Sequence, residues 1–237
     1  LTDQLYRSDH VWWKIFQRAL LGIGGMRALQ SLGYNIDCYH LNEGHAACAI
    51  LEKYVSLADK SEMESFKDKF VFTCHTPVEA GHDRFNISDM AKVLNHEYIE
   101  AAEKFGKATP DSQQINFTII ALNNCRKANA VAQKHGEVMR YQFPKYADKI
   151  GAITNGIHAH TWMSESFAKL FDQYRQTLGD WRQEPENLVN ITKLTKDENF
   201  RRDIFNAHQA NKKNLIEFVR HWQLRDDVFT LGWARRI

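Results

Sequence analysis

The chain has 237 residues, of which 43% are hydrophobic and 25% are charged, a composition typical of a soluble protein with one large domain or two small ones. Its 31 basic and 29 acidic residues leave a formal charge of +2, which gives no reason to expect nucleic acid or an anionic membrane as a partner.

The cysteines and the N-terminal residues indicate the cellular compartment. Cys38, Cys48, Cys74 and Cys125 are widely spaced and form no CxxC pair, so we expect reduced thiols and a cytoplasmic location. No run of about 18 apolar residues predicts a membrane span. The opening LTDQLYRSDH lacks the basic and apolar regions of a signal peptide, and the missing initial Met indicates a chain cut at its front.

The first half of the chain alternates between helical and strand patterns. Helical spacing of apolar residues is weakened by Gly24 and Gly25 and stops at Gly33. The apolar runs NIDCYHL and KFVFTCHT read as buried strands. The predicted helices cover 11–32, 44–57, 61–66 and 87–106, and the predicted strands cover 35–41 and 69–76.

The second half continues the alternation. A long helical pattern covers 115–142, with β-rich first residues, and the strand IGAITNGI follows at 150–157. Helices are predicted over 163–178 and 197–222, and a closing strand over 227–237. Strands and helices that alternate with short connections predict an α/β fold, a parallel sheet with helices on both faces. The polar stretch 180–190 is the best candidate for a hinge.

Polar side chains collect where the predicted strands end, which is where parallel α/β sheets bind ligands. Asn42 and His45 follow the first strand, His75 and Thr76 follow the second, and Asn155 follows the third. Amide and imidazole groups are donors and acceptors suited to neutral hydroxyls, so a sugar is the natural ligand. No nucleophile–base pair is obvious among them.

Each of these signals has a simpler structural interpretation. Asn42 reads as the cap of the helix that follows, and spacing alone favours that reading. Asn155 and Gly156 form a common turn dipeptide. His135 lies on an apolar stripe and is expected to be a hydrogen-bonded core residue. His158 and His160 form an H-x-H pair, but a metal site needs three or four ligands, so we expect none.

Five motifs in order, YHLNEGHAA, FTCHTPVEAGHDRF, ANAVAQKHGEV, ITNGIHAHTW and FTLGWARR, resemble the α-glucan (glycogen, starch and maltodextrin) phosphorylases, and most closely their shorter bacterial and archaeal branch. The resemblance spans nearly the whole chain. It implies a GT-B fold, in which two Rossmann-like domains face each other across a cleft. This chain would then be a fragment, with the later part of the N-terminal domain at 1–179, hinge helices at 180–226, and the first C-terminal strand at 227–237.

The resemblance assigns roles to residues near the transferred sugar. Asp9 ends a segment similar to the loop that gates the catalytic site. Asn42, Glu43 and His45 resemble the wall beside the glucosyl pocket, with Glu43 in place of an aspartate. A further contact is implied for Val131, which falls where the family packs a valine on the sugar.

The remaining assignments concern a hydroxyl and two phosphates. His75 matches the histidine that contacts the 6-hydroxyl of the transferred glucose, and Asn155 matches the asparagine that contacts the same hydroxyl. Arg236 resembles the arginine that holds the substrate phosphate, and Arg235 the basic residue near the cofactor phosphate. His75 and Arg236 are therefore the candidate catalytic residues.

The implied reaction is phosphorolysis of the terminal α-1,4-linked glucose of an α-glucan by inorganic phosphate, which releases glucose 1-phosphate. The implied cofactor is pyridoxal 5′-phosphate, whose Schiff-base lysine would lie beyond Ile237, so the fragment alone is expected to be inactive. Family members are often dimers, so the resemblance is compatible with a homo-oligomer. No nucleic-acid or membrane partner is implied.

Two alternatives stay open at this point. One is a GT-B glucosyltransferase that uses a nucleotide sugar, and the other is a non-catalytic glucan-binding protein. The second stays open because of three departures from the family pattern, at His10, Glu43 and Ala130.

Overall fold

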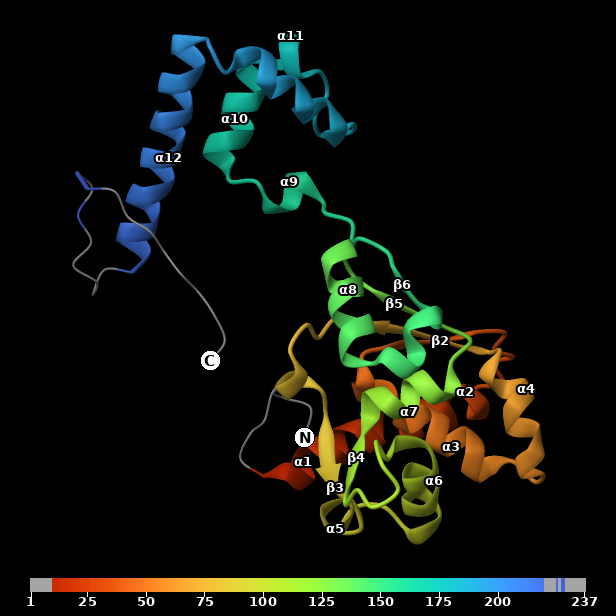
Figure 1. Cartoon of the computed structure of the whole chain (residues 1–237). Helices are drawn as coiled ribbons and strands as arrows, with labels where there is room; N and C mark the ends of the chain where they lie inside the picture. Colours follow the sequence, from red (N-terminus) through yellow and green to blue (C-terminus); the bar gives the residue numbers. More distant parts are fainter. Residues whose placement is uncertain (1–9, 220–224, 226, 229–237) are drawn as a thin grey trace. The chain divides into compact units, whose positions relative to one another are not determined.

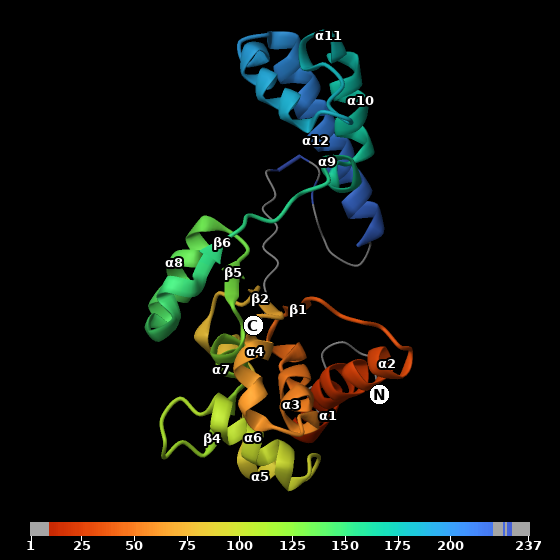
Figure 2. The ribbon, with the colours of Figure 1, turned by 90° about the vertical axis from the view of Figure 1, so that its right-hand side faces the viewer.

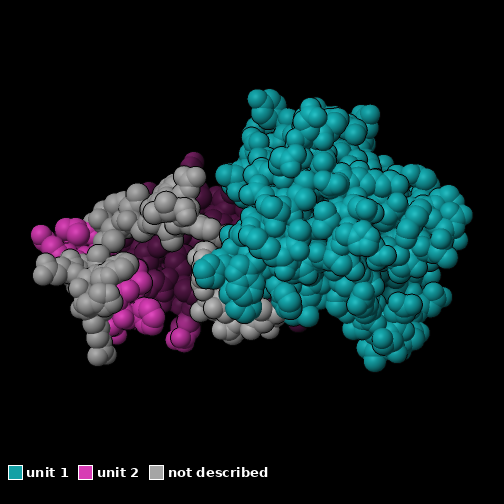
Figure 3. All heavy atoms as spheres, turned by 90° about the horizontal axis from the view of Figure 1, so that it is seen from below, with its two compact units in different colours: residues 1–155 teal, residues 156–237 magenta. Residues whose placement is uncertain are grey.

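The computed structural model describes residues 10–219, 225, 227 and 228, and it divides the chain into two compact units. Unit 1 comprises residues 1–155 and unit 2 residues 156–237 (Figure 3). The domain boundaries at 179/180 and 226/227 concern a longer two-domain protein and stay a prediction.

Unit 1 is built on a four-stranded parallel sheet, which confirms the predicted α/β class (Figure 1). The strands follow one another across the sheet in chain order: β1 (Tyr39–Asn42), β2 (Phe70–Cys74), β5 (Lys127–Ala130) and β6 (Ile150–Ala152). In this register Asn42 lies beside Thr73, and Cys74 lies beside Ala130. The carboxyl ends of all four strands therefore lie at one edge.

The crossover helices α3 (Cys48–Ser56), α7 (Phe117–Asn124) and α8 (Gln133–Gln142) cover one face of this sheet. Parallel crossovers are right-handed, so strands that are added in a single direction place every connection on the same side. Figures 1 and 2 show α3 and α7 together on one side of β1 and β2. The sequence predicts helices on both faces of the sheet. Among the described residues, the helices that connect its strands lie on this one face.

The two faces differ in chemistry as a period of two requires. Residues on the covered face are apolar and belong to the main core: Leu41, Phe70, Phe72, Cys74, Ala128, Ala130 and Ile150. The alternate positions include the polar residues His40, Thr73 and Asn129 beside the apolar Val71. There Thr73 Oγ1 lies 2.7 Å from His40 Nε2 and 2.8 Å from Asn129 Oδ1, a hydrogen-bonded row across three strands.

A long helical run precedes the sheet, as predicted for 11–32. It consists of α1 (Val11–Ala19), a π-helical turn η1 (Leu20–Gly24) and α2 (Gly25–Ser31). The run ends before Gly33, whose φ of 74° is a conformation that glycine adopts at little cost, so the predicted stop is confirmed. Other short elements of unit 1 are η2 (Gly44–Ala46), η3 (Lys60–Glu62), α4 (Met63–Lys67), η4 (Glu79–Gly81) and η5 (Pro144–Lys149).

Two predicted helices are wrong. The pattern over 115–142 contains a short strand β4 (Gln114–Asn116), helix α7, the sheet strand β5 and helix α8. Strand β5 is four residues long and rich in alanine, so its local preference is helical, and pairing with β2 and β6 overrides it. The pattern over 87–106 is divided into α5 (Ile87–Met90) and α6 (His96–Gly106), because Asn95 caps a new helix through its bond from Tyr98 N. Strand β3 (Arg84–Asn86) pairs antiparallel with β4.

The described part of unit 2 is helical. Its elements are α9 (Ala159–Trp162), α10 (Glu165–Gln173), α11 (Arg175–Leu178), η6 (Pro185–Leu194) and α12 (Glu198–Phe218). Asp197 caps α12 by accepting from Asn199 N at 2.8 Å, as the start of the predicted helix required. A separate core forms around the buried indole of Trp181. The strand predicted over 227–237 lies outside the described residues, apart from two of its positions.

The cysteines behave as the sequence predicts. All four are free thiols, and three of them are buried in the core of unit 1. Burial raises the pKa of the Cys48 thiol to about 12, so this side chain acts as a small apolar residue. Within the described residues, every helix is too short or too polar to cross a lipid bilayer.

Candidate functional site

The sequence-predicted residues Asn42, His75 and Asn155 all lie at the edge where the strands of the sheet end, with Asn42 and Asn155 at its two outer strands. Asn42 ends β1, His75 follows β2, and Asn155 follows β6. Since the strands are parallel, these positions share the edge where the strands' carboxyl ends lie. Asn155 N donates to Val131 O at 3.0 Å, which ties the segment after β6 to the segment after β5.

The side chains of these three residues are exposed, and among the described residues no hydrogen bond or ion pair uses them. The reading of Asn42 as a helix cap is wrong, because the cap position of η2 is Glu43 and no side chain caps that turn. The prediction of a turn at Asn155–Gly156 is also wrong, since residues 153–158 form neither a turn nor a strand. These amide and imidazole groups are therefore available to a ligand.

The other predicted residues have different surroundings. Val131 is half-buried just after β5, and Ala130 is fully buried within that strand. Asp9, Arg235 and Arg236 lie outside the described residues, so the gating loop and the phosphate contacts stay predictions.

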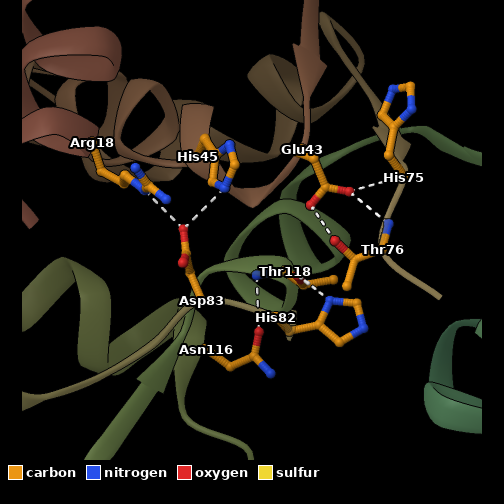
Figure 4. A network of polar contacts seen from close by, with 9 residues as sticks. All are labelled: Arg18, Glu43, His45, His75, Thr76, His82, Asp83, Asn116 and Thr118. Atoms are coloured by element: carbon orange, nitrogen blue, oxygen red, sulfur yellow. Dashed lines mark hydrogen bonds and ion pairs between the residues drawn. The ribbon is translucent and has the colours of Figure 1, made fainter. Parts of the chain in front are cut away.

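Glu43 joins the end of β1 to the segment after β2 (Figure 4). One carboxylate oxygen accepts hydrogen bonds from the backbone N–H groups of His75 and Thr76, the second at 3.0 Å. The other oxygen accepts from the Thr76 hydroxyl at 3.2 Å. The φ of Glu43 is 69°, a strained value for a residue with a side chain, and the hydrogen bonds offset that strain. In Figure 4 the His75 ring points away from this carboxylate.

The electrostatics of Glu43 follow from these contacts. Burial alone would raise the pKa of the carboxyl group, but the hydrogen bonds from His75, Cys74 and Thr76 lower it, and the net pKa lies below its ordinary value. A depressed folded-state pKa stabilises the fold above the unfolded-state pKa. That contribution is lost as the pH falls through the folded-state pKa.

We expect Glu43→Gln to reduce the free energy of unfolding at pH 7 by about 1 kcal/mol, because a neutral amide oxygen accepts more weakly than a carboxylate. The difference from the native chain should shrink as the pH falls below the ordinary carboxyl pKa near 4.5 and then through the lower folded-state pKa of Glu43. Urea unfolding at pH 7 and at pH 3 measures the difference in the free energy of unfolding. Glu64→Gln is the matched control, since Glu64 is exposed and pairs with Lys67 on the surface. A difference that is independent of pH would show that the charge of Glu43 plays no part.

His135 ties the second and third strand ends together. Its Nδ1 accepts from Val131 N at 3.3 Å, and its Nε2 lies 3.0 Å from Thr76 O, to which it donates. The ring is buried, so the prediction of a hydrogen-bonded core histidine is confirmed. Together with Glu43 and the Asn155–Val131 bond, it fixes the relative positions of all four strand ends.

The segment after β2 is also held in place by His82, a residue to which the sequence assigns no role. His82 is buried, with Nδ1 3.0 Å from Thr118 Oγ1 and Nε2 3.1 Å from Gln142 Oε1. The start of α7 is capped by Asn116, which accepts from Thr118 N at 2.9 Å. The sequence signal for this segment is the polar run GHD, which lies within the motif FTCHTPVEAGHDRF that follows the second predicted strand.

His45 has less freedom than the sequence suggests. Its Nε2 lies 3.5 Å from Asp83 Oδ2, and the same oxygen accepts from Arg18 Nε at 2.8 Å (Figure 4). Burial lowers the pKa of His45, Arg18 lowers it further, and the carboxylates Asp83 and Glu43 oppose these effects. Since the net pKa is below the ordinary value near 6.5, the imidazole is neutral at pH 7.

Two hollows in the described part of unit 1 lie away from this edge. One has residues of α3 and α6 in its wall, including Tyr54 and His96, and the other contains Tyr34 and Tyr39. Tyr39 begins β1, so the second hollow lies at the opposite edge of the sheet. Among the described residues, no three His, Cys, Asp or Glu side chains gather as a metal-binding group.

The arrangement offers hydrogen-bonding groups of the kind that suit a neutral polar ligand. The side chains of Asn42, His75 and Asn155 have no described partner. They lie at the strand ends, a rim whose backbone is held by Glu43, His82 and His135. Because the backbone here is already held in place, a ligand that binds these groups has to order only the three exposed side chains. No described residue of this rim has the paired nucleophile and base of a hydrolase.

Comparison with known proteins gives consistent matches. The family model described as "Carbohydrate phosphorylase" matches residues 26–228. The maltodextrin phosphorylase of Thermococcus litoralis is 31% identical over all of this chain and 31% of its own length. The glycogen phosphorylase of Aquifex aeolicus is 25% identical over all of this chain and 39% of its own length. That of Mycobacterium tuberculosis is 29% identical over 72% of this chain and 23% of its own length. The chain thus spans about a third of the length of these relatives.

Proposed function

Since the chain belongs to the carbohydrate phosphorylase family, we propose that it forms part of an enzyme that cleaves the terminal α-1,4-linked glucose of α-glucans with inorganic phosphate. The product is glucose 1-phosphate. The observation that carries the proposal within the structure is the set of exposed, uncommitted side chains at Asn42, His75 and Asn155, on strand ends that their neighbours hold in place.

In this proposal the described residues position the sugar. His75 and Asn155 donate to and accept from the 6-hydroxyl of the transferred glucose, while Asn42 and His45 stand at the side of the ring. Val131 packs against the sugar. Fixed contacts to ring hydroxyls favour an oxocarbenium-like transition state when they strengthen as the ring flattens.

The phosphate and cofactor contacts are assigned to residues outside the described ranges. Arg236 is proposed to hold inorganic phosphate as a bidentate donor. When bound, pyridoxal 5′-phosphate would supply a proton relay through its phosphate group. Arg235, the residue assigned to that group, lies outside the described residues, and the described residues act on the sugar alone. A cytoplasmic location and a homo-oligomeric state belong to the same proposal.

The test is an assay of the full-length protein with maltodextrin and inorganic phosphate, in which glucose 1-phosphate is measured. We expect product with phosphate and none when sulfate replaces it. The 237-residue chain alone should give no product. Transfer from a nucleotide sugar without phosphorolysis would instead identify a synthase, and glucan binding without either reaction would identify a non-catalytic protein. Both outcomes would overturn the proposal.

A further inference from the structure

We propose that Arg18 and Asp83 form a positioning pair for His45, which fixes the imidazole at the sheet edge and keeps its outward nitrogen available as a hydrogen-bond acceptor. The inference rests on the proposed function for its catalytic consequence, but the geometry of the three side chains stands independently of it.

The pair is built from two distant segments. Arg18 comes from the buried side of α1 and is 8% exposed, while Asp83 precedes β3. The side chains of both residues are at least 86% buried, and one carboxylate oxygen of Asp83 accepts from Arg18 Nε at 2.8 Å. Exposed ion pairs contribute little, but breaking a buried pair leaves an uncompensated charge. The two residues are therefore expected to hold each other in one arrangement.

The backbone on both sides of the pair is fixed. Asp83 O accepts from Phe117 N at 3.0 Å, and the preceding His82 is held by two side-chain partners. On the other side, Gly44 packs so closely on the start of α7 that an added Cβ would lie 3.3 Å from Thr118 N. The backbone beside His45 therefore cannot shift relative to that of Asp83 without disturbing the core.

The contact with Asp83 selects a tautomer. Nε2 is the ring nitrogen that faces the carboxylate, at 3.5 Å, so the negative charge favours the neutral tautomer that carries its proton there. Nδ1 is then left as an acceptor, and His45 is about one-third exposed. A carboxylate alone would also favour the protonated ring, in which Nδ1 no longer accepts. The guanidinium of Arg18 neutralises Asp83 and removes this bias.

The charged groups that act on His45 come from every side. They are Arg18 from α1, Asp83 from the segment before β3, and Glu43 from the end of β1. Arg18 lowers the pKa of His45, and both carboxylates raise it. Removal of Arg18 and removal of Asp83 must therefore shift the titration of His45 in opposite directions, a result that a purely structural role would not produce.

The experiment is a proton NMR titration of the histidines in this chain, with the His45 signal identified from its loss in His45→Gln. We expect Arg18→Gln to raise the pKa of His45, because the variant removes a nearby positive charge. Asp83→Asn should lower it, and Arg18→Lys should leave it near the native value. Arg84→Gln is the matched control, because Arg84 pairs with Glu79 on the surface one residue from Asp83.

Activity of the full-length protein supplies the second measurement. When the pH is lowered from 8 to 6, His45 becomes protonated in Arg18→Gln, and the KM of this variant for maltodextrin should rise several-fold. The KM of the native protein should stay nearly constant over the same range. If the native protein shows no phosphorolysis, the proposed function fails and the titration still decides the coupling. If Arg18→Gln does not fold, Asp83→Asn gives the decisive shift. An unchanged His45 titration in the variants that fold, or shifts without any change in KM, would overturn the inference.

Discussion

Replacement of His75 by alanine is expected to reduce glucose 1-phosphate formation by the full-length protein at least tenfold. His75 is proposed to bind the 6-hydroxyl of the transferred glucose. Loss of one partner of a buried hydrogen bond costs about 1–3 kcal/mol, and about 1.4 kcal/mol corresponds to tenfold. The measurement is the steady-state rate of phosphorolysis with maltodextrin and saturating phosphate.

This substitution separates function from folding unusually well. The His75 ring is exposed and makes no described hydrogen bond, and its backbone N–H, which donates to Glu43, is retained by alanine. The melting temperature should therefore change little. His96→Ala is the control, since His96 is also exposed but begins α6, away from the sheet edge. Full activity in His75→Ala would remove this residue from the site.

Replacement of Gly22 by alanine should destabilise unit 1 by about 3 kcal/mol, the upper end of the usual cost of overpacking. Gly22 lies in the π-helical turn η1, where it crosses α3. An added Cβ would lie 2.5 Å from Ala49 N and 2.6 Å from Cys48 C. These are backbone atoms, which cannot rotate aside, so the two helices would have to separate. Thermal or urea unfolding of the chain measures the loss.

Gly25→Ala provides the opposite expectation in the same helical run. Nothing lies within 4 Å of a Cβ at Gly25, and its φ is −61°, an ordinary helical value. Alanine there should stabilise the chain by about 0.5–1 kcal/mol, because glycine loses more backbone entropy on folding. Equal effects at the two positions would contradict the close crossing of η1 and α3.

A segment's structure can be predicted from the sequence when the local preferences of its residues agree with the structure that it adopts in the fold. Strand β2 is an apolar, β-branched run, which predicts a strand, whereas β5 is a short alanine-rich segment whose local pattern predicts a helix. Only the hydrogen bonds from β2 and β6 make β5 a strand. The same reason explains the missed break at Asn95, where a side-chain cap outweighs a continuous helical pattern.

The sequence by itself determined the family resemblance, the parallel α/β class and the place of the polar residues at the strand ends, because these depend on motif order and on local apolar patterns. Only the tertiary structure decided which polar groups are committed to the protein. Glu43 accepts from a residue 33 positions away, and Arg18 reaches Asp83 across 65 positions, so their partners cannot be read locally. Asn42, His75 and Asn155 are left uncommitted because folding supplies no partner to their side chains among the described residues.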